Sequence, residues 1–198
     1  MSLGKELDGR EANLAIIGSF GAIFNIPYTD IVLNFAKIWR NYQASTIHNK
    51  LVDYMDAIER MTPNDREHLK LKIENNKNFR RDVVSVLMEM IDNVCTDMNI
   101  DVLANITHAL AEGNISTDDF YRLSLTLRRC IYSDLEKLVK YREASVDGSG
   151  YLDRESQSST FCLYSAGFLY MPVIGGEYNF VVNDLGEKMI KFGLKISI

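Results

Sequence analysis

The sequence has few cysteines and no cysteine pattern. Three occur among 198 residues, at Cys95, Cys130 and Cys162. Because their number is odd, their spacings are wide and no CxxC pair is present, neither a disulfide framework nor a zinc site is predicted. We expect reduced, buried thiols in a cytoplasmic protein. The N-terminus also has no apolar segment after a basic start, so no secretory signal is predicted.

Motifs that carry known chemistry are missing as well. The three histidines, His48, His68 and His108, are isolated from one another and from metal-ligating neighbours in the sequence, so no metal site is predicted. No GxSxG, P-loop or GxGxxG segment occurs. The adjacent acids Asp118 and Asp119 fit a helix start better than a general acid and base. We therefore expect a non-enzymatic protein with no catalytic residue, no cofactor and no metal.

The chain has no excess of basic charge. Its 22 Lys and Arg residues and 27 Asp and Glu residues give a net charge of −5, which argues against a dedicated nucleic-acid binder. The densest basic stretch covers residues 68–81. It could contact nucleic acid or an anionic lipid surface, or it could form a solvated helix face. The residues concerned are Lys70, Lys72, Lys77, Arg80 and Arg81.

One uncharged run near the N-terminus covers residues 12–29. A transmembrane helix needs about 20 predominantly apolar residues, and polar residues, glycines and Pro27 interrupt this run. Three interpretations stay open: a buried helix, a partner interface, or insertion that holds the protein at the membrane periphery. Residues 1–26 are thus predicted to be an apolar helix or interaction segment. Its candidate contact residues are Ile16, Ile17, Phe20, Ile23 and Phe24.

Helical periodicity dominates residues 27–112, which we predict to be a helical domain. Apolar residues recur at steps of three and four from Pro27 to Met61, as in an amphipathic helix. Thr62 is placed to cap the next helix, with Pro63 at its first position. Gly113 is a natural stop for the last helix. Two apolar stripes lie between, one at Val83, Val86, Leu87, Met90, Ile91 and Val94, the other at Leu103, Ile106 and Leu110.

Further capping signals follow Gly113. Ser116 or Thr117 is placed to cap one helix, with acids in its first turn. Ser133 is placed to cap another, with Glu136 three residues on. The segment ASVDGSGYLDRES (residues 144–156) matches the centre of an EF-hand loop but has serines where the first and the bidentate carboxylates belong. Calcium binding is therefore not expected, and a turn between helices is predicted.

The last part of the chain contains two β-rich runs, residues 168–174 and 178–182, separated by a glycine pair typical of a hairpin turn. Asn183 or Asp184 is placed to cap a closing helix. The Ala-Gly-Phe segment at 166–168 and the Asn-Asp-Leu-Gly-Glu-Lys segment at 183–188 are those found around the wing of many prokaryotic winged-helix domains. Residues 117–194 resemble such a domain, and the whole order of segments looks like that of small bacterial or phage-borne proteins.

The resemblance implies three helices followed by a β-hairpin wing, and it implies DNA as a possible ligand of the third helix. The residues of this chain give that ligand little support. Arg154 stands between two acids, and the wing carries no basic residue. The other polar residues of the predicted third helix are Gln157, Ser158, Ser159 and Thr160.

The predicted fold class is mainly α, with a helical N-terminal layer and a winged-helix-like part over residues 113–198. The predicted function is protein interaction or regulation, through a protein partner or self-association. A DNA-binding regulator and a membrane-associated protein that inserts residues 12–29 are the alternatives.

Overall fold

The structure is a computed structural model that describes residues 44–75, 83, 86–87, 89–91, 93, 97–146, 157–174 and 177–196. These residues are mainly helical, which confirms the mainly α part of the predicted fold class. They fall into two compact units, divided between Asp92 and Asn93. The C-terminal unit therefore includes residues 97–112, which the sequence had assigned to the preceding helical domain. Residues 1–26, with the predicted contact residues Ile16, Ile17, Phe20, Ile23 and Phe24, lie outside the described residues.

The N-terminal unit contains helices α3 (Ala44–Glu59) and α4 (Pro63–Asn75). As predicted, the Thr62 hydroxyl accepts a hydrogen bond from the backbone N–H of Asp65 at 3.2 Å and caps α4. The buried apolar side chains recur at helical spacing in both helices. They are Leu51, Tyr54, Met55, Ala57 and Ile58 in α3, and Leu69 and Ile73 in α4.

The described positions between 83 and 93 are all helical, and most of the predicted first stripe is buried there, at Val83, Leu87, Met90 and Ile91. The second stripe is buried in α6 (Asp97–Glu112) of the C-terminal unit. Gly113 follows α6 with φ of +80°, a left-handed conformation that ends the helix as predicted. The apolar spacing alone therefore located both core-facing surfaces.

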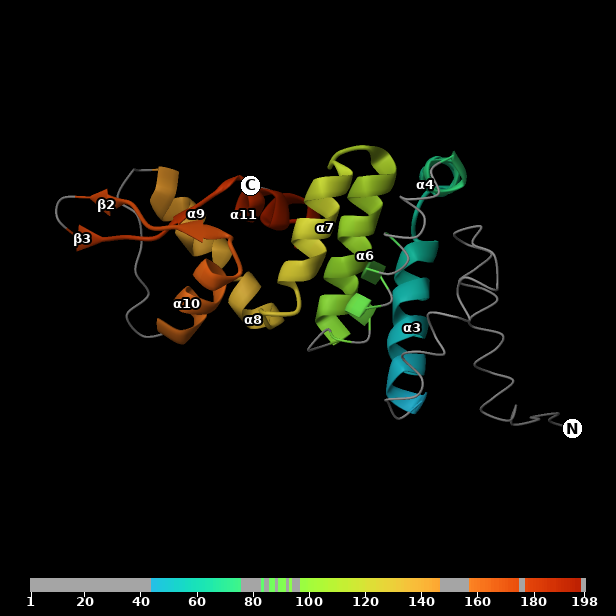
Figure 1. Ribbon diagram of the computed structural model, residues 1–198, viewed down its shortest axis with the longest axis horizontal. Helices are drawn as coiled ribbons and strands as arrows, with labels where there is room; N and C mark the ends of the chain where they lie inside the picture. The colour runs from blue at the N-terminus through green and yellow to red at the C-terminus, as the bar shows by residue number, and fades with distance from the viewer. Residues whose placement is uncertain are drawn as a thin grey trace, which may run out of the picture. The chain divides into compact units, whose positions relative to one another are not determined.

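Helix α7 (Thr117–Thr126) runs beside α6, as Figure 1 shows. Its core contacts come from Phe120 and Leu123, which are fully buried. The buried Asn99 of α6 donates from Nδ2 to the carbonyl oxygen of Cys130 at 2.9 Å and so fixes the chain that follows α7. This bond also fixes the backbone position of Cys130.

Helix α8 (Tyr132–Leu135) corrects one prediction. It begins after Ile131, which makes no side-chain cap, so Ser133 lies inside the helix rather than at its start. The carbonyl oxygen of Ile131 accepts from the backbone N–H groups of Asp134 and Leu135 at 3.0 and 3.3 Å. Leu135 is fully buried. No capping hydroxyl therefore marks the start of α8, whose one buried residue is Leu135.

Helices α9 (Leu138–Val146) and α10 (Gln157–Ser165) are joined by polar bonds. Lys137, just before α9, donates from Nζ to the Ser159 hydroxyl at 2.7 Å, and the buried Tyr141 and Thr160 hydroxyls share a short hydrogen bond. Ser159 and Thr160 are buried. All of the segment between these helices, residues 147–156, lies outside the described residues, and most of the predicted turn at 144–156, where calcium binding is not expected, falls there. Residues 144–146 belong to α9.

A two-stranded ribbon follows α10. Strand β1 (Leu169–Tyr170) pairs with β4 (Val181–Val182), and β2 (Val173–Ile174) pairs with β3 (Glu177–Tyr178), all antiparallel. The register joins residue 169 to 182 and residue 174 to 177, so the two predicted β-rich runs pair with each other. The outer strands β2 and β3 extend away from the helices of this unit (Figure 1).

The chain closes with α11 (Asp184–Lys188) and one π-helical turn, η1 (Met189–Gly193). Asn183 caps α11 as predicted: its Oδ1 accepts from the backbone N–H of Gly186 at 3.0 Å. Only glycine fits at 186, because an added Cβ would lie 2.6 Å from the carbonyl oxygen of Phe168. Asn105 of α6 donates to the carbonyl oxygen of Gly193 at 2.8 Å and holds η1 against α6.

Candidate functional site

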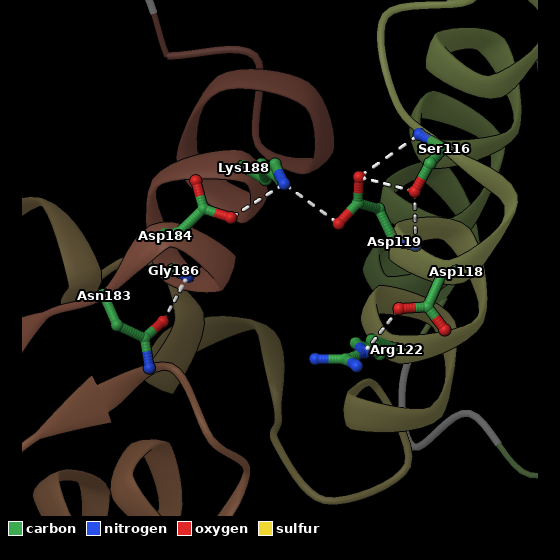
Figure 2. A network of polar contacts seen from close by, with 8 residues as sticks. All are labelled: Ser116, Asp118, Asp119, Arg122, Asn183, Asp184, Gly186 and Lys188. Carbon is green, nitrogen blue, oxygen red and sulfur yellow. Dashed lines mark hydrogen bonds and ion pairs between the residues drawn. The ribbon is translucent and has the colours of Figure 1, made fainter.

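A polar network joins the start of α7 to α11 (Figure 2). Ser116 caps α7, accepting from the backbone N–H of Asp119 at 3.1 Å and donating from its own backbone N–H and hydroxyl to Asp119 Oδ2. This is the reciprocal capping box. The other carboxylate oxygen, Oδ1, accepts from Lys188 Nζ at 2.9 Å. The adjacent acids thus serve a helix start, as predicted, and one of them also serves a long-range ion pair.

Lys188 is shared between two carboxylates. Its second partner, Asp184 Oδ2, lies 2.7 Å from Nζ on the same helix. The hydrogen bonds that Lys188 donates to Asp184 and then to Asp119 raise the pKa of Lys188 above its usual value, and burial opposes them only in part. The Lys188 hydrogen bond lowers the pKa of Asp119, burial opposes it, and Ser116 adds to the lowering. Both groups are therefore held charged.

A second ion pair lies nearby. Arg142 Nε of α9 contacts both carboxylate oxygens of Glu187 in α11, at 3.0 and 2.8 Å. The Nη1 atom of Arg142 is buried and makes no hydrogen bond to any residue the structure describes. A buried guanidinium nitrogen without an acceptor is unfavourable, so this atom marks a point where an oxygen ligand would be stabilised.

Arg142 and Lys188 line a pocket of about 760 Å³ at the C-terminal end of the chain. Two more cations, Lys191 and Lys195, lie on its wall, against one carboxylate. Such a lining favours an anion over a cation. The remaining wall residues are Glu187 and three apolar residues, Ile190, Phe192 and Ile196.

The outer face of α10 is aromatic and carries no charge. Phe161 and Tyr164 are 58% and 42% exposed, one helical turn apart. Both rings pack edge-on against the buried Phe180 of the ribbon, with centroids 6.2 and 5.5 Å from it. The exposed residues of α10 all fall on this one face, which we call the α10 aromatic face. It consists of Gln157, Ser158, Phe161, Tyr164 and Ser165.

Of the four polar residues predicted as contacts in α10, two are exposed and two are buried. Gln157 and Ser158 are exposed, but Ser159 and Thr160 point into the core, where their hydroxyls bond to Lys137 and Tyr141. They are thus unavailable to any ligand of this helix. Polarity alone did not show which of these four residues face the core, because this short helix has no strong apolar stripe to orient it.

The predicted basic contacts are only partly described. Lys70 and Lys72 lie on α4, where Lys70 Nζ is 3.9 Å from the Glu67 carboxylate and Lys72 is exposed. Lys70 is thus partly neutralised within its own helix. The remaining predicted contacts lie outside the described residues: Lys77, Arg80, Arg81 and Arg154.

The residues that the structure describes contain neither a metal-binding cluster nor a membrane-spanning helix. Within the described ranges, no three His, Cys, Asp or Glu side chains gather as a metal would require. None of the helices described is both long enough and apolar enough to cross a bilayer. Comparison with known proteins adds no relative: no family model, curated protein or solved structure matches the chain.

Proposed function

We propose that this chain is a non-enzymatic interaction or regulatory protein, and that its C-terminal unit is a winged-helix-like module that binds a second copy of the chain. The observation that carries the proposal is the α10 aromatic face. Phe161 and Tyr164 are both more than two-fifths exposed and supported from below by Phe180. Exposed aromatic rings on a rigid support are typical of protein interfaces.

The order of elements supports the winged-helix-like part. Helices α7, α8 with α9, and α10 are followed by a ribbon and a closing helix. Helix α9 contacts β4 and α10 contacts β1, so the ribbon packs on the helices that precede it. Helix α10 takes the place of the third helix, which presents the binding surface in domains of this kind.

The absence of charge on the α10 aromatic face permits a second copy as the partner. The chain carries a net charge of −5, so contact between copies through charged surfaces brings like charges together. The α10 aromatic face avoids this repulsion because none of its residues is charged. A two-fold contact would bring each Phe161 and Tyr164 pair against its own copy. Two rings form a small core, so we expect a dimer weaker than an obligate one.

DNA is the alternative ligand of this helix, and it has less support. Residues 157–165 contain no Lys or Arg, whereas DNA binding needs several cations on the phosphates. The membrane alternative depends on residues 12–29, which lie outside the described residues.

The test is the molar mass of the full chain, measured by light scattering after size exclusion over a range of concentrations. The wild type should approach a dimer as concentration rises, and the double variant Phe161→Ser, Tyr164→Ser should stay monomeric. Leu125→Ser is the matched control, because Leu125 of α7 is 44% exposed and lies off the α10 aromatic face. A wild type that is monomeric throughout, or a double variant that dimerises unchanged, contradicts the proposal.

A further inference from the structure

Two cysteines distant in sequence meet in the C-terminal unit. The Sγ atoms of Cys130 and Cys162 are 3.2 Å apart, although 32 residues separate them. Cys130 lies between α7 and α8, and Cys162 lies in α10. A disulfide has an S–S distance of about 2.05 Å, so the sulfurs need to approach by roughly a further 1.2 Å to bond.

The backbone on both sides of the pair is held in place. Asn99 donates to the carbonyl oxygen of Cys130, as described above. Arg129 Nη1 donates to the carbonyl oxygen of Ser165 at 3.1 Å, and the Cys162 thiol lies 2.8 Å from the carbonyl oxygen of Arg129. The Cys162 thiol has one proton, which it donates either to this oxygen or to the Cys130 sulfur. These bonds hold the two segments together and so keep the two thiols adjacent.

We propose that Cys130 and Cys162 form a reversible thiol–disulfide site whose oxidant is a hydroperoxide. Cys130 is fully buried, whereas Cys162 is partly exposed. Cys162 therefore meets the oxidant first, and Cys130 serves as the resolving thiol. The proposal does not rest on dimerisation, since both cysteines belong to one chain.

The chemistry balances in two steps. The Cys162 thiol loses its proton to water, and the thiolate sulfur attacks one oxygen of the peroxide. The O–O bond breaks, the departing oxygen takes up a proton to become water, and Cys162 becomes a sulfenic acid. The Cys130 sulfur then attacks the Cys162 sulfur, the S–O bond breaks, and the hydroxyl leaves as water with the Cys130 proton. Two electrons pass from the thiols to hydrogen peroxide, which yields two waters; a dithiol reverses the step.

The disulfide would tie the segment after α7 covalently to α10. That link restrains the helix that carries Phe161 and Tyr164 without removing either ring from the surface. Oxidation should therefore stabilise the C-terminal unit whether or not the chain dimerises.

The test is peptide mapping of the full chain after treatment with hydrogen peroxide and alkylation of the remaining thiols. Trypsin separates the three cysteines, because Cys130 falls in peptide 130–137, Cys162 in 155–188 and Cys95 in 82–122. We expect a cross-linked species of the first two peptides, which dithiothreitol resolves. Thiol titration should show that two of the three thiols are lost and then recovered.

Two variants serve as controls. Cys95→Ser should lose both remaining thiols to the same cross-link. Cys130→Ala should give no cross-link and leave Cys162 as a sulfenic or sulfinic acid. The proposal is overturned if the oxidised wild type gives no peptide joining 130–137 to 155–188, whether its thiols survive excess peroxide or are lost in other products. That wild-type result needs no variant to fold.

Discussion

Lys188 Nζ lies 2.9 Å from Oδ1 of Asp119, a residue 69 positions earlier in the chain. The same carboxylate closes the capping box of α7 through its other oxygen, Oδ2. Asp119 therefore takes part in two interactions, the local cap of α7 and a long-range ion pair with α11. Since Lys188 and Asp119 are 27% and 19% exposed, solvent screens this pair less than a surface pair.

The double role of Asp119 predicts unequal costs for removing the two partners. Asp119→Ala removes both the cap and the ion pair and should reduce the free energy of unfolding by about 2–3 kcal/mol. Lys188→Met leaves the cap and should cost about 1 kcal/mol. Urea unfolding followed by circular dichroism measures both. Arg122→Met is the control: its pair with Asp118 is 67% and 72% exposed and should contribute less than about 0.5 kcal/mol. Equal losses for all three would contradict this account.

The same pair predicts the pH dependence of stability. The folded pKa of Asp119 is lowered, so its contribution is present above the unfolded value of about 3.9 and is lost as the pH falls through the folded value. The folded pKa of Lys188 is raised, so its contribution is present below 10.5 and is lost as the pH rises through the folded value. Melting temperatures against pH should show a shallower acid limb in Asp119→Asn and a shallower alkaline limb in Lys188→Met. If both variants kept the wild-type acid and alkaline slopes of melting temperature against pH, the ion pair would contribute nothing to the pH dependence of stability.

Gly186→Ala tests the close approach of α11 to the ribbon. The new methyl group would lie 2.6 Å from the Phe168 carbonyl oxygen and 2.7 Å from a Val182 methyl group. Because the Phe168 backbone oxygen cannot move away without shifting the main chain, we expect the free energy of unfolding in urea to fall by about 1–3 kcal/mol. Gly193→Ala is the comparison, because its nearest neighbour would be the flexible Met189 sulfur. A smaller loss at 186 than at 193 would contradict the stated contact.

Oxidation of Cys130 and Cys162 should stabilise the chain. The disulfide would close a loop of about 33 residues, for which the chain-entropy relation gives roughly 3–4 kcal/mol before native strain is subtracted. The urea midpoint of the peroxide-treated protein should therefore exceed that of the reduced protein, and Cys130→Ala should show no such difference. An unchanged midpoint in a fully cross-linked sample would mean that native strain cancels the gain.

Local signals in the sequence were sufficient for much of the fold. Thr62, Ser116 and Asn183 cap their helices as predicted, because a cap depends on residues two or three positions away. Ser133 shows the limit of that rule. It has the same local pattern, yet α8 begins after Ile131, which makes no side-chain cap, and Ser133 lies within the helix.

The features of the site depend on pairs that no local pattern reveals. Asp119 with Lys188, Arg142 with Glu187, and Cys130 with Cys162 are 69, 45 and 32 residues apart. Only the tertiary fold brings them together. The exposed rings of α10 were missed for another reason: an aromatic residue in a short helix is more often core than surface, and only Phe180 beneath them shows which side faces out.

We propose that the C-terminal unit binds a second copy of the chain and not nucleic acid. Sedimentation equilibrium of the full chain, alone and with excess mixed-sequence duplex DNA at low salt, tests it most directly. The account predicts a concentration-dependent dimer whose mass the DNA leaves unchanged. A monomer that co-sediments with the DNA would contradict it.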